Sequence, residues 1–227
     1  MCGGFRSDVP YEKVARVKEK NRKIGLGLMG IHEWLLVRGY DYSINDELEE
    51  WLHYWKACGE IGANAASNQL GINHPKKYRS IAPTGTIGIL ASTTTGIEPL
   101  YAVAYKRRYL VGKDKWKYEY VIDATAQHLI DKYNLDPDAI ETSASLAQNP
   151  EKRIKFQYDV QKYVDMAISS TLNLPAYADQ TFSPREFSEI VLKYIKGLRG
   201  LTVYPDGSRG GRVLLKNLLR AFFIFLM

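Results

Sequence analysis

Apolar residues recur at helical spacing in two long stretches near the start of the chain. A charged segment from Pro10 leads into a glycine-rich joint, IGLGLMG, and then into an apolar face at Ile31, Trp34 and Leu35. This pattern predicts two helices, the second ending at Gly39. A third and longer helix is predicted to begin within residues 43–46, because apolar or small residues follow at spacings of three and four: Leu48, Leu52, Trp55, Gly59, Gly62 and Ala66. Its small residues predict close packing against a sheet or another helix.

The middle of the chain alternates short apolar runs with polar connections. Residues 79–82 read as a short strand that Pro83 ends, and residues 101–105 as a buried strand. Residues 106–120 form a basic excursion that turns at Gly112-Lys113-Asp114, before a helix over 121–133. An irregular connection over 142–150 and a helix over about 157–171 are predicted next, with Val160, Val164, Ala167 and Ile168 facing inward.

The last clear pattern is a helix followed at once by a strand. Ser183-Pro184-Arg185-Glu186 has the residues of a capping box with proline at the first helical position. The helix is predicted to run to Gly197, and RGLTVY then reads as a strand. Such units build sheets covered by helices, so the sequence predicts the α/β class. No linker marks a domain boundary.

Length and charge limit the kinds of partner. The chain has 227 residues, of which 45% are hydrophobic and 25% charged, which is enough for a substantial core. A net charge of +6 favours anionic partners but is modest for a dedicated nucleic-acid binder, so no nucleic acid is expected. No apolar run reaches the length of a bilayer span and no leader is apparent. We therefore expect a cytoplasmic protein with no transmembrane segment.

Cysteine and histidine are sparse and scattered. Cys2 and Cys58 exclude a disulfide framework and form no Cys-x-x-Cys pair. Cys58 lies between Ala57 and Gly59 and is expected to be a small core residue. The four histidines lack ligand spacing, so no metal site is predicted. No catalytic residue is assigned.

The segment from Pro83 to Ile87 is the main candidate for chemistry. Pro83 ends a strand, Gly85 allows a ligand to approach the backbone, and Thr84 and Thr86 add hydroxyl donors. Exposed N–H groups where a helix begins bind phosphate. The alternative is a solvated corner, and the residues alone leave the two readings open.

The basic residues near this segment either add a positive field or form a solvated face: Lys76, Lys77, Arg79, Lys106, Arg107 and Arg108. Glu98 either holds this loop by accepting N–H bonds or caps a turn.

The end of the chain differs from the rest. Arg212, Lys216 and Arg220 share one helical face opposite leucines, and an apolar run follows them. This predicts a basic amphipathic helix that lies on a membrane or fills a partner's groove, or else a foreign end.

Four motifs together indicate a family. Between residues 21 and 209 they are, in order, NRKIGLGLMGIHEWLL, IAPTGTIGILASTTTGIEPLYAVAYKRR, SSTLNLP and GLRGLTVYPDGSR. Together they resemble the carboxy-terminal part of the ribonucleotide reductase catalytic chain. The resemblance is to the adenosylcobalamin-dependent, class II branch. It implies part of a ten-stranded α/β barrel over residues 1–210, followed by an atypical tail over 211–227. It also implies that the phosphates of a ribonucleoside di- or triphosphate bind at Pro83, Thr84, Gly85, Thr86 and Ile87, and that the cofactor is adenosylcobalamin.

The sequence also departs from that family. It has no Asn-x-Cys-x-Glu pattern, in which the family places its radical cysteine, and neither Cys2 nor Cys58 lies in a matching context. We therefore expect a reductase component that converts ribonucleotides to deoxyribonucleotides only with a complementary N-terminal reductase chain. One alternative is a non-catalytic module that binds nucleotide phosphates. Another is a basic interaction protein that uses the tail on membranes or nucleic acid.

Overall fold

The structure is a computed structural model and describes residues 8–112, 115–175, 183–205 and 212–213. Its helices are α2 (Glu12–Asn21), α3 (Ile31–Val37), α4 (Asp46–Leu70), α5 (Gly85–Leu90), α6 (Ala124–Tyr133), α7 (Ser143–Leu146), α8 (Pro150–Gln161) and α9 (Pro184–Tyr194), with 3₁₀ turns η1 (Pro137–Ala139) and η3 (Ile195–Gly197). Its strands are β1 (Ala104–Val111), β2 (Lys115–Ile122), β3 (Thr171–Leu174), β4 (Thr202–Pro205) and β5 (Arg212–Val213).

Four extended segments run parallel to one another, and we call them the parallel layer. Residues 24–26 bond to residues 77–80, with a parallel bridge between Leu26 and Arg79. The next bridge joins Ile81 to Ile168, and β3 then pairs in parallel with β4. The layer is thus 24–26, 79–81, 166–174 and 202–205, and every connection between its members contains helix. The predicted α/β class is confirmed.

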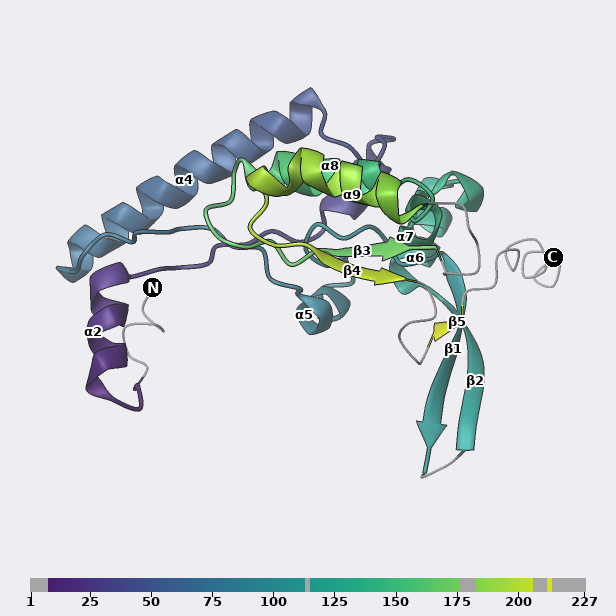
Figure 1. Ribbon diagram of the computed structural model, residues 1–227, viewed down its shortest axis with the longest axis horizontal. Helices are drawn as coiled ribbons and strands as arrows, with labels where there is room; N and C mark the ends of the chain where they lie inside the picture. The colour runs from purple at the N-terminus through teal and green to yellow at the C-terminus, as the bar shows by residue number, and fades with distance from the viewer. Residues whose placement is uncertain (1–7, 113–114, 176–182, 206–211, 214–227) are drawn as a thin grey trace.

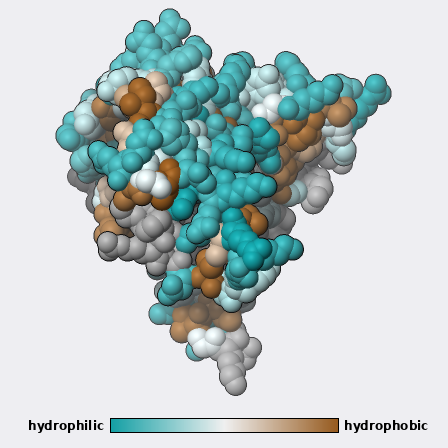
Figure 2. Space-filling model, turned by 90° about the vertical axis from the view of Figure 1, so that its left-hand side faces the viewer, coloured by the Kyte–Doolittle hydropathy of each residue, from teal (hydrophilic) through white to brown (hydrophobic). Residues whose placement is uncertain are grey.

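The parallel layer does not close. The resemblance implies ten strands in a barrel, whereas the described residues contain these four parallel segments and an antiparallel sheet of order β2-β1-β5. In Figure 1, α8 and α9 lie above β3 and β4, α5 lies below them, and the β1/β2 hairpin projects from the body. The face seen in Figure 2 is mostly hydrophilic, with separate apolar patches.

The core consists of three clusters that link the helices to the parallel layer. The largest joins α3, α4 and α8 to residues of the layer and includes Leu35, Leu52, Ile81, Phe156 and Ile168. A second joins α3 to α6 through Leu36 and Leu129. The third packs α9 on α8 and β3 through Tyr194, Ile154 and Leu172. The apolar spacing read from the sequence is therefore largely the buried face.

Several predicted elements are confirmed by the structure. The two early helices, the joint between them and the long helix appear as α2, α3 and α4, and Gly39 has a φ of +71° just beyond α3. Residue 27 of the joint must be glycine, because a Cβ there would lie 2.8 Å from the Ser80 carbonyl oxygen. The basic excursion is the β1/β2 hairpin. The capping box at Ser183 and Glu186 starts α9, and RGLTVY supplies β4.

Other predicted boundaries are wrong. The helix expected over 157–171 is α8, which begins at Pro150 and ends at Gln161, and the irregular connection contains α7. Buried polar residues hide its period, since Arg153, Gln157, Asp159 and Gln161 are buried with the apolar ones. The strand expected over 101–105 starts only at Ala104, and residues 121–122 belong to β2 rather than to a helix.

Two further expectations concern α4 and the tail. Cys58 is exposed rather than a core residue, because it lies on the outer face of α4, whose other face buries Leu52, Ala63 and Ser67. Arg212 and Val213 pair with β1 as β5, so the predicted tail helix does not begin there. The remainder of the tail, residues 214–227, lies outside the described residues.

Candidate functional site

The candidate loop, Pro83 to Ile87, lies at the carboxyl edge of the parallel layer. It follows residues 79–81 directly, and the glycine joint after residues 24–26 reaches the same edge. Gly30 N–H donates to the Thr94 carbonyl oxygen at 2.8 Å, which brings the joint and the threonine-rich segment together. In α/β folds this edge is where loops gather around ligands. The sequence anticipated the loop but not its place beside the joint.

Thr84 sets the direction of the loop. Its φ of +50° is left-handed, an uncommon conformation for a β-branched residue. The Thr84 side-chain oxygen accepts the N–H of Gly96 at 2.8 Å, and its carbonyl oxygen accepts the N–H of Gly88 at 2.7 Å. These bonds begin the short helix α5 immediately after the turn.

The first three N–H groups of α5 have no hydrogen-bond partner among the described residues. They belong to Gly85, Thr86 and Ile87, which are exposed. A Cβ placed on Gly85 meets nothing within 4 Å, so packing does not require glycine there. At Gly88, by contrast, a Cβ would lie 2.7 Å from the Thr95 methyl group. The loop thus presents three donors and an unobstructed backbone to solvent.

The second threonine run is part of the scaffold. Thr94 accepts the N–H of Glu33 through its side-chain oxygen at 3.2 Å, and the Thr93 hydroxyl donates to the Glu33 carboxylate. Both bonds fasten the segment after α5 to the start of α3. The sequence did not separate the roles of the two runs, since both are rich in threonine.

Glu98 has a role that the sequence did not predict. Its carboxylate bonds neither to the loop nor to a turn: one carboxylate oxygen accepts the backbone N–H of Thr171 at 2.5 Å and the other accepts from Arg153 at 2.5 Å. Burial raises the pKa of Glu98, while Arg153 and the Thr171 N–H oppose that shift. Arg153 was missed because it lies between the predicted irregular connection, over 142–150, and the predicted start of the helix at about residue 157. The Asn149-Pro150 pair, a helix cap followed by proline at the first helical position, was the available signal.

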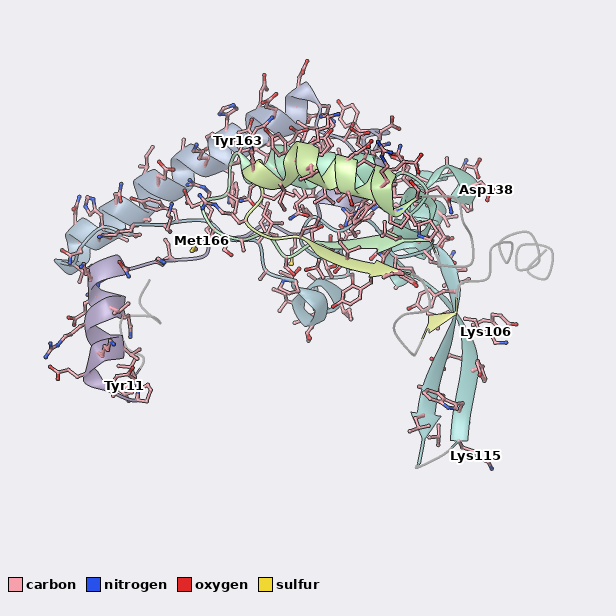
Figure 3. All side chains as sticks on the ribbon, viewed as in Figure 1. Tyr11, Lys106, Lys115, Asp138, Tyr163 and Met166 are labelled. Atoms are coloured by element: carbon pink, nitrogen blue, oxygen red, sulfur yellow. The ribbon has the colours of Figure 1, made fainter. Side chains whose placement is uncertain are left out.

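The basic residues considered near the loop have other surroundings in the structure. Arg79 is 1% exposed and bonds to Glu60 at 2.7 Å and Asp165 at 3.1 Å, so it is a structural residue. Lys106 lies over the rings of Tyr118 and Tyr120 on the hairpin. Figure 3 shows Lys106 and Lys115 along that hairpin, which points away from the body.

Among the described residues, no group of three or more histidine, cysteine, aspartate or glutamate side chains is arranged to hold a metal ion. His32 is buried, its Nδ1 accepts the N–H of Leu100 at 3.0 Å, and burial lowers its pKa to about 3. Within the described ranges, no helix is both long enough and apolar enough to cross a bilayer.

Residues 64–204 match the family described as ribonucleotide reductase, barrel domain. The chain belongs to the ribonucleotide reductase family. It is 29% identical to the vitamin B12-dependent ribonucleoside-diphosphate reductase of Mycobacterium tuberculosis (strain ATCC 25618 / H37Rv), over 92% of this chain and 34% of that protein. It is 24% identical to the enzyme of the same description from Thermoplasma acidophilum, over 90% of this chain and 31% of the relative.

Solved structures have the same fold. A B12-dependent, class II ribonucleotide reductase superposes with a TM-score of 0.68 at 15% identity, over 91% of this chain and 34% of the other. The class Id ribonucleotide reductase alpha subunit of Actinobacillus ureae superposes with a TM-score of 0.64 at 16% identity, over 89% of this chain and 42% of the other. The parallel layer is therefore part of a reductase barrel-domain fold. The chain spans about a third of the length of the curated relatives it matches.

Proposed function

We propose that this chain supplies the phosphate-binding end of a ribonucleotide reductase active site. In this proposal Pro83, Thr84, Gly85, Thr86 and Ile87 receive the phosphates of a ribonucleoside di- or triphosphate. The observation that carries the proposal is the row of three N–H groups at the carboxyl edge of the parallel layer, which belong to exposed residues and have no partner in the part of the chain that the structure describes. Backbone N–H groups at the start of a helix suit an anion.

The reaction would replace the ribose 2′-hydroxyl by hydrogen. The hydroxyl leaves as water, and two electrons come from thiols carried by the complementary N-terminal reductase chain, which also supplies the radical cysteine. This chain's contribution is positioning, which lowers a barrier by on the order of 7–11 kcal/mol at best. Residues 1–210 would form the barrel part and residues 211–227 the atypical tail.

Adenosylcobalamin is proposed as the cofactor of the complete enzyme, on the resemblance and the names of the relatives. His32 is not an accessible cobalt ligand, because it is buried and its Nδ1 accepts the N–H of Leu100. No step is derived through the cofactor.

Nucleotide binding tests the loop. Uridine diphosphate is titrated into the chain and into Thr86→Val, which keeps the side chain's shape but removes a hydroxyl donor from an exposed position. We expect binding by the parent and about tenfold weaker binding by the variant, since one bond to a charged group is worth roughly 1.5–3 kcal/mol. Thr202→Val, exposed at the opposite end of the layer, is the matched control. Equal affinities for Thr86→Val and the parent would show that the Thr86 hydroxyl is not a phosphate donor, and absence of binding by the parent would exclude the loop.

Reconstitution tests the reaction. The chain, adenosylcobalamin, a dithiol and the complementary part of a B12-dependent relative are mixed, and deoxynucleotide formation is measured. Product from the mixture, but from neither component alone, is the expected result. Nucleotide binding without product from a well-folded pair would favour the alternative, a non-catalytic phosphate-binding module. Lipid or polynucleotide binding that depends on residues 211–227 would favour the interaction protein instead.

A further inference from the structure

Arg153 forms the centre of a buried polar network. Its side chain is 3% exposed and extends from α8 into the core. The guanidinium donates to the Tyr42 hydroxyl, to Glu98 at 2.5 Å, to the Ser170 hydroxyl at 3.1 Å and to the Thr171 carbonyl oxygen at 2.9 Å. One side chain thus binds α8 to the start of β3 and to Glu98.

The network also fixes the residue before Glu98. The Tyr42 hydroxyl accepts from Arg153 and donates to the Ile97 carbonyl oxygen. Ile97 is held through its backbone and Glu98 through its carboxylate, so two consecutive residues depend on the same guanidinium. Because all of these partners are buried or half-buried, a ligand at the surface does not touch Arg153.

Those two residues are joined directly to the candidate loop. Gly96 precedes Ile97 and donates its N–H to the Thr84 side chain, the residue whose left-handed turn directs the N–H groups of α5. Gly96 itself has a φ of +52°, and a Cβ there would lie 3.2 Å from the Ala82 carbonyl oxygen. A shift of Ile97 and Glu98 is therefore passed to both sides of the turn.

We propose that Arg153 is a positioning residue for the phosphate loop: through Glu98, Tyr42 and Gly96 it holds Thr84 so that the donors of Gly85, Thr86 and Ile87 converge on one anion. The inference rests on the proposed function. It adds that the affinity of the exposed loop is set by a buried residue far along the chain. A lysine at this position keeps the charge but cannot reach four partners.

The test compares uridine diphosphate and pyrophosphate binding by the parent, Arg153→Lys and Gln157→Ala. Gln157 is buried on the same helix, but it bonds to the Gly200 carbonyl oxygen at 2.8 Å, away from the loop. Affinities are measured by calorimetry well below each variant's melting temperature, and the amide signals of residues 85–87 are followed by NMR. We expect at least tenfold weaker binding of both probes and displaced amide signals for Arg153→Lys alone.

A milder pair of variants covers the case in which Arg153→Lys does not fold. Tyr42→Phe removes only the hydroxyl between Arg153 and Ile97, and Tyr163→Phe removes a hydroxyl in the same core cluster that bonds to Glu49 at 2.6 Å. Tyr42→Phe should weaken binding severalfold while Tyr163→Phe does not. If the network variants bind like the parent, or if the controls lose as much affinity, the positioning role is wrong. A parent that binds neither probe would instead overturn the proposed function itself.

Discussion

At the scale of single residues, burial changes what a side chain can do. His32 is 1% exposed, and the N–H of Leu100 is donated to its Nδ1, so the ring is neutral in the folded chain. Burial, with the nearby positive charge of Arg153, lowers its pKa to about 3 from an ordinary 6.5. A buried neutral histidine makes folding depend on pH.

We expect stability to fall as pH drops below 6.5, because the unfolded chain then binds a proton that the folded chain does not bind until about pH 3. The loss approaches about 1.4 kcal/mol for each pH unit within that window. Urea denaturation between pH 6.5 and 5 measures it. His32→Gln should flatten the dependence, and His128→Gln, at an exposed position, should not. Parallel slopes for the parent and His32→Gln would contradict this.

Gly85 and Gly88 make a second comparison at this scale. Gly85→Ala adds a methyl group in open space, so we expect an unchanged melting temperature and weaker nucleotide binding. Gly88→Ala brings a Cβ within 2.7 Å of the Thr95 methyl group and should lower the melting temperature. Calorimetry and thermal denaturation of both variants check the pair. Full nucleotide affinity in Gly85→Ala would show that the ligand does not approach this backbone.

At the scale of elements, α4 is fastened to the parallel layer by one buried cation. Arg79 donates to the Tyr163 carbonyl oxygen at 2.7 Å and to the Lys56 carbonyl oxygen at 3.2 Å, besides its two carboxylate partners. Asp165 in turn accepts the N–H groups of Tyr78 and Arg79. Helix, layer and the segment after α8 therefore meet at this side chain.

Arg79→Ala should destabilise the chain by about 3–5 kcal/mol, because it leaves buried acceptors without their partner. Lys76→Ala, at an exposed position nearby, should change the free energy of unfolding by less than about 0.5 kcal/mol. Chemical denaturation measures both. A small decrease in the free energy of unfolding of Arg79→Ala would mean that water replaces the guanidinium as the partner of these acceptors.

Elements with one apolar face were predictable from the sequence, and those buried on all sides were not. The spacing of Leu48 and Leu52 and the capping box of α9 led to correct helices, because each pattern reflects a local preference. Helix α8 was misplaced since Gln157 is as buried as Phe156 and Asp159 is also buried. The loop from Pro83 to Ile87 was a candidate site from its residues and from the family resemblance, and it stays a prediction; its link to Arg153 depends on tertiary contacts that no local pattern records.

At the scale of the whole molecule, apolar side chains lie in water on the side of the layer where α5 projects. Ile89 is 80% and Leu90 85% exposed. Exposed apolar patches of this kind favour association. The complementary chain of the proposed reductase would cover them.

We expect the isolated chain to self-associate as its concentration rises, and the double variant Ile89→Ser, Leu90→Ser to do so less at an unchanged melting temperature. Sedimentation equilibrium gives the mass of each. Leu192→Ser is the control, since Leu192 is 70% exposed on α9, across the layer. If Leu192→Ser reduces the mass as much as the double variant, association does not proceed through α5.

The parallel layer has a consequence for how this polypeptide reaches its native state. Its neighbours are Leu26 beside Arg79, Ile81 beside Ile168 and Thr171 beside Thr202, so each pairing waits for a long stretch of chain to be synthesised. Such high contact order slows folding. A ribosome would release most of this sequence before the second pairing could form, and a chaperone that shields nascent chains would then raise the yield of native protein.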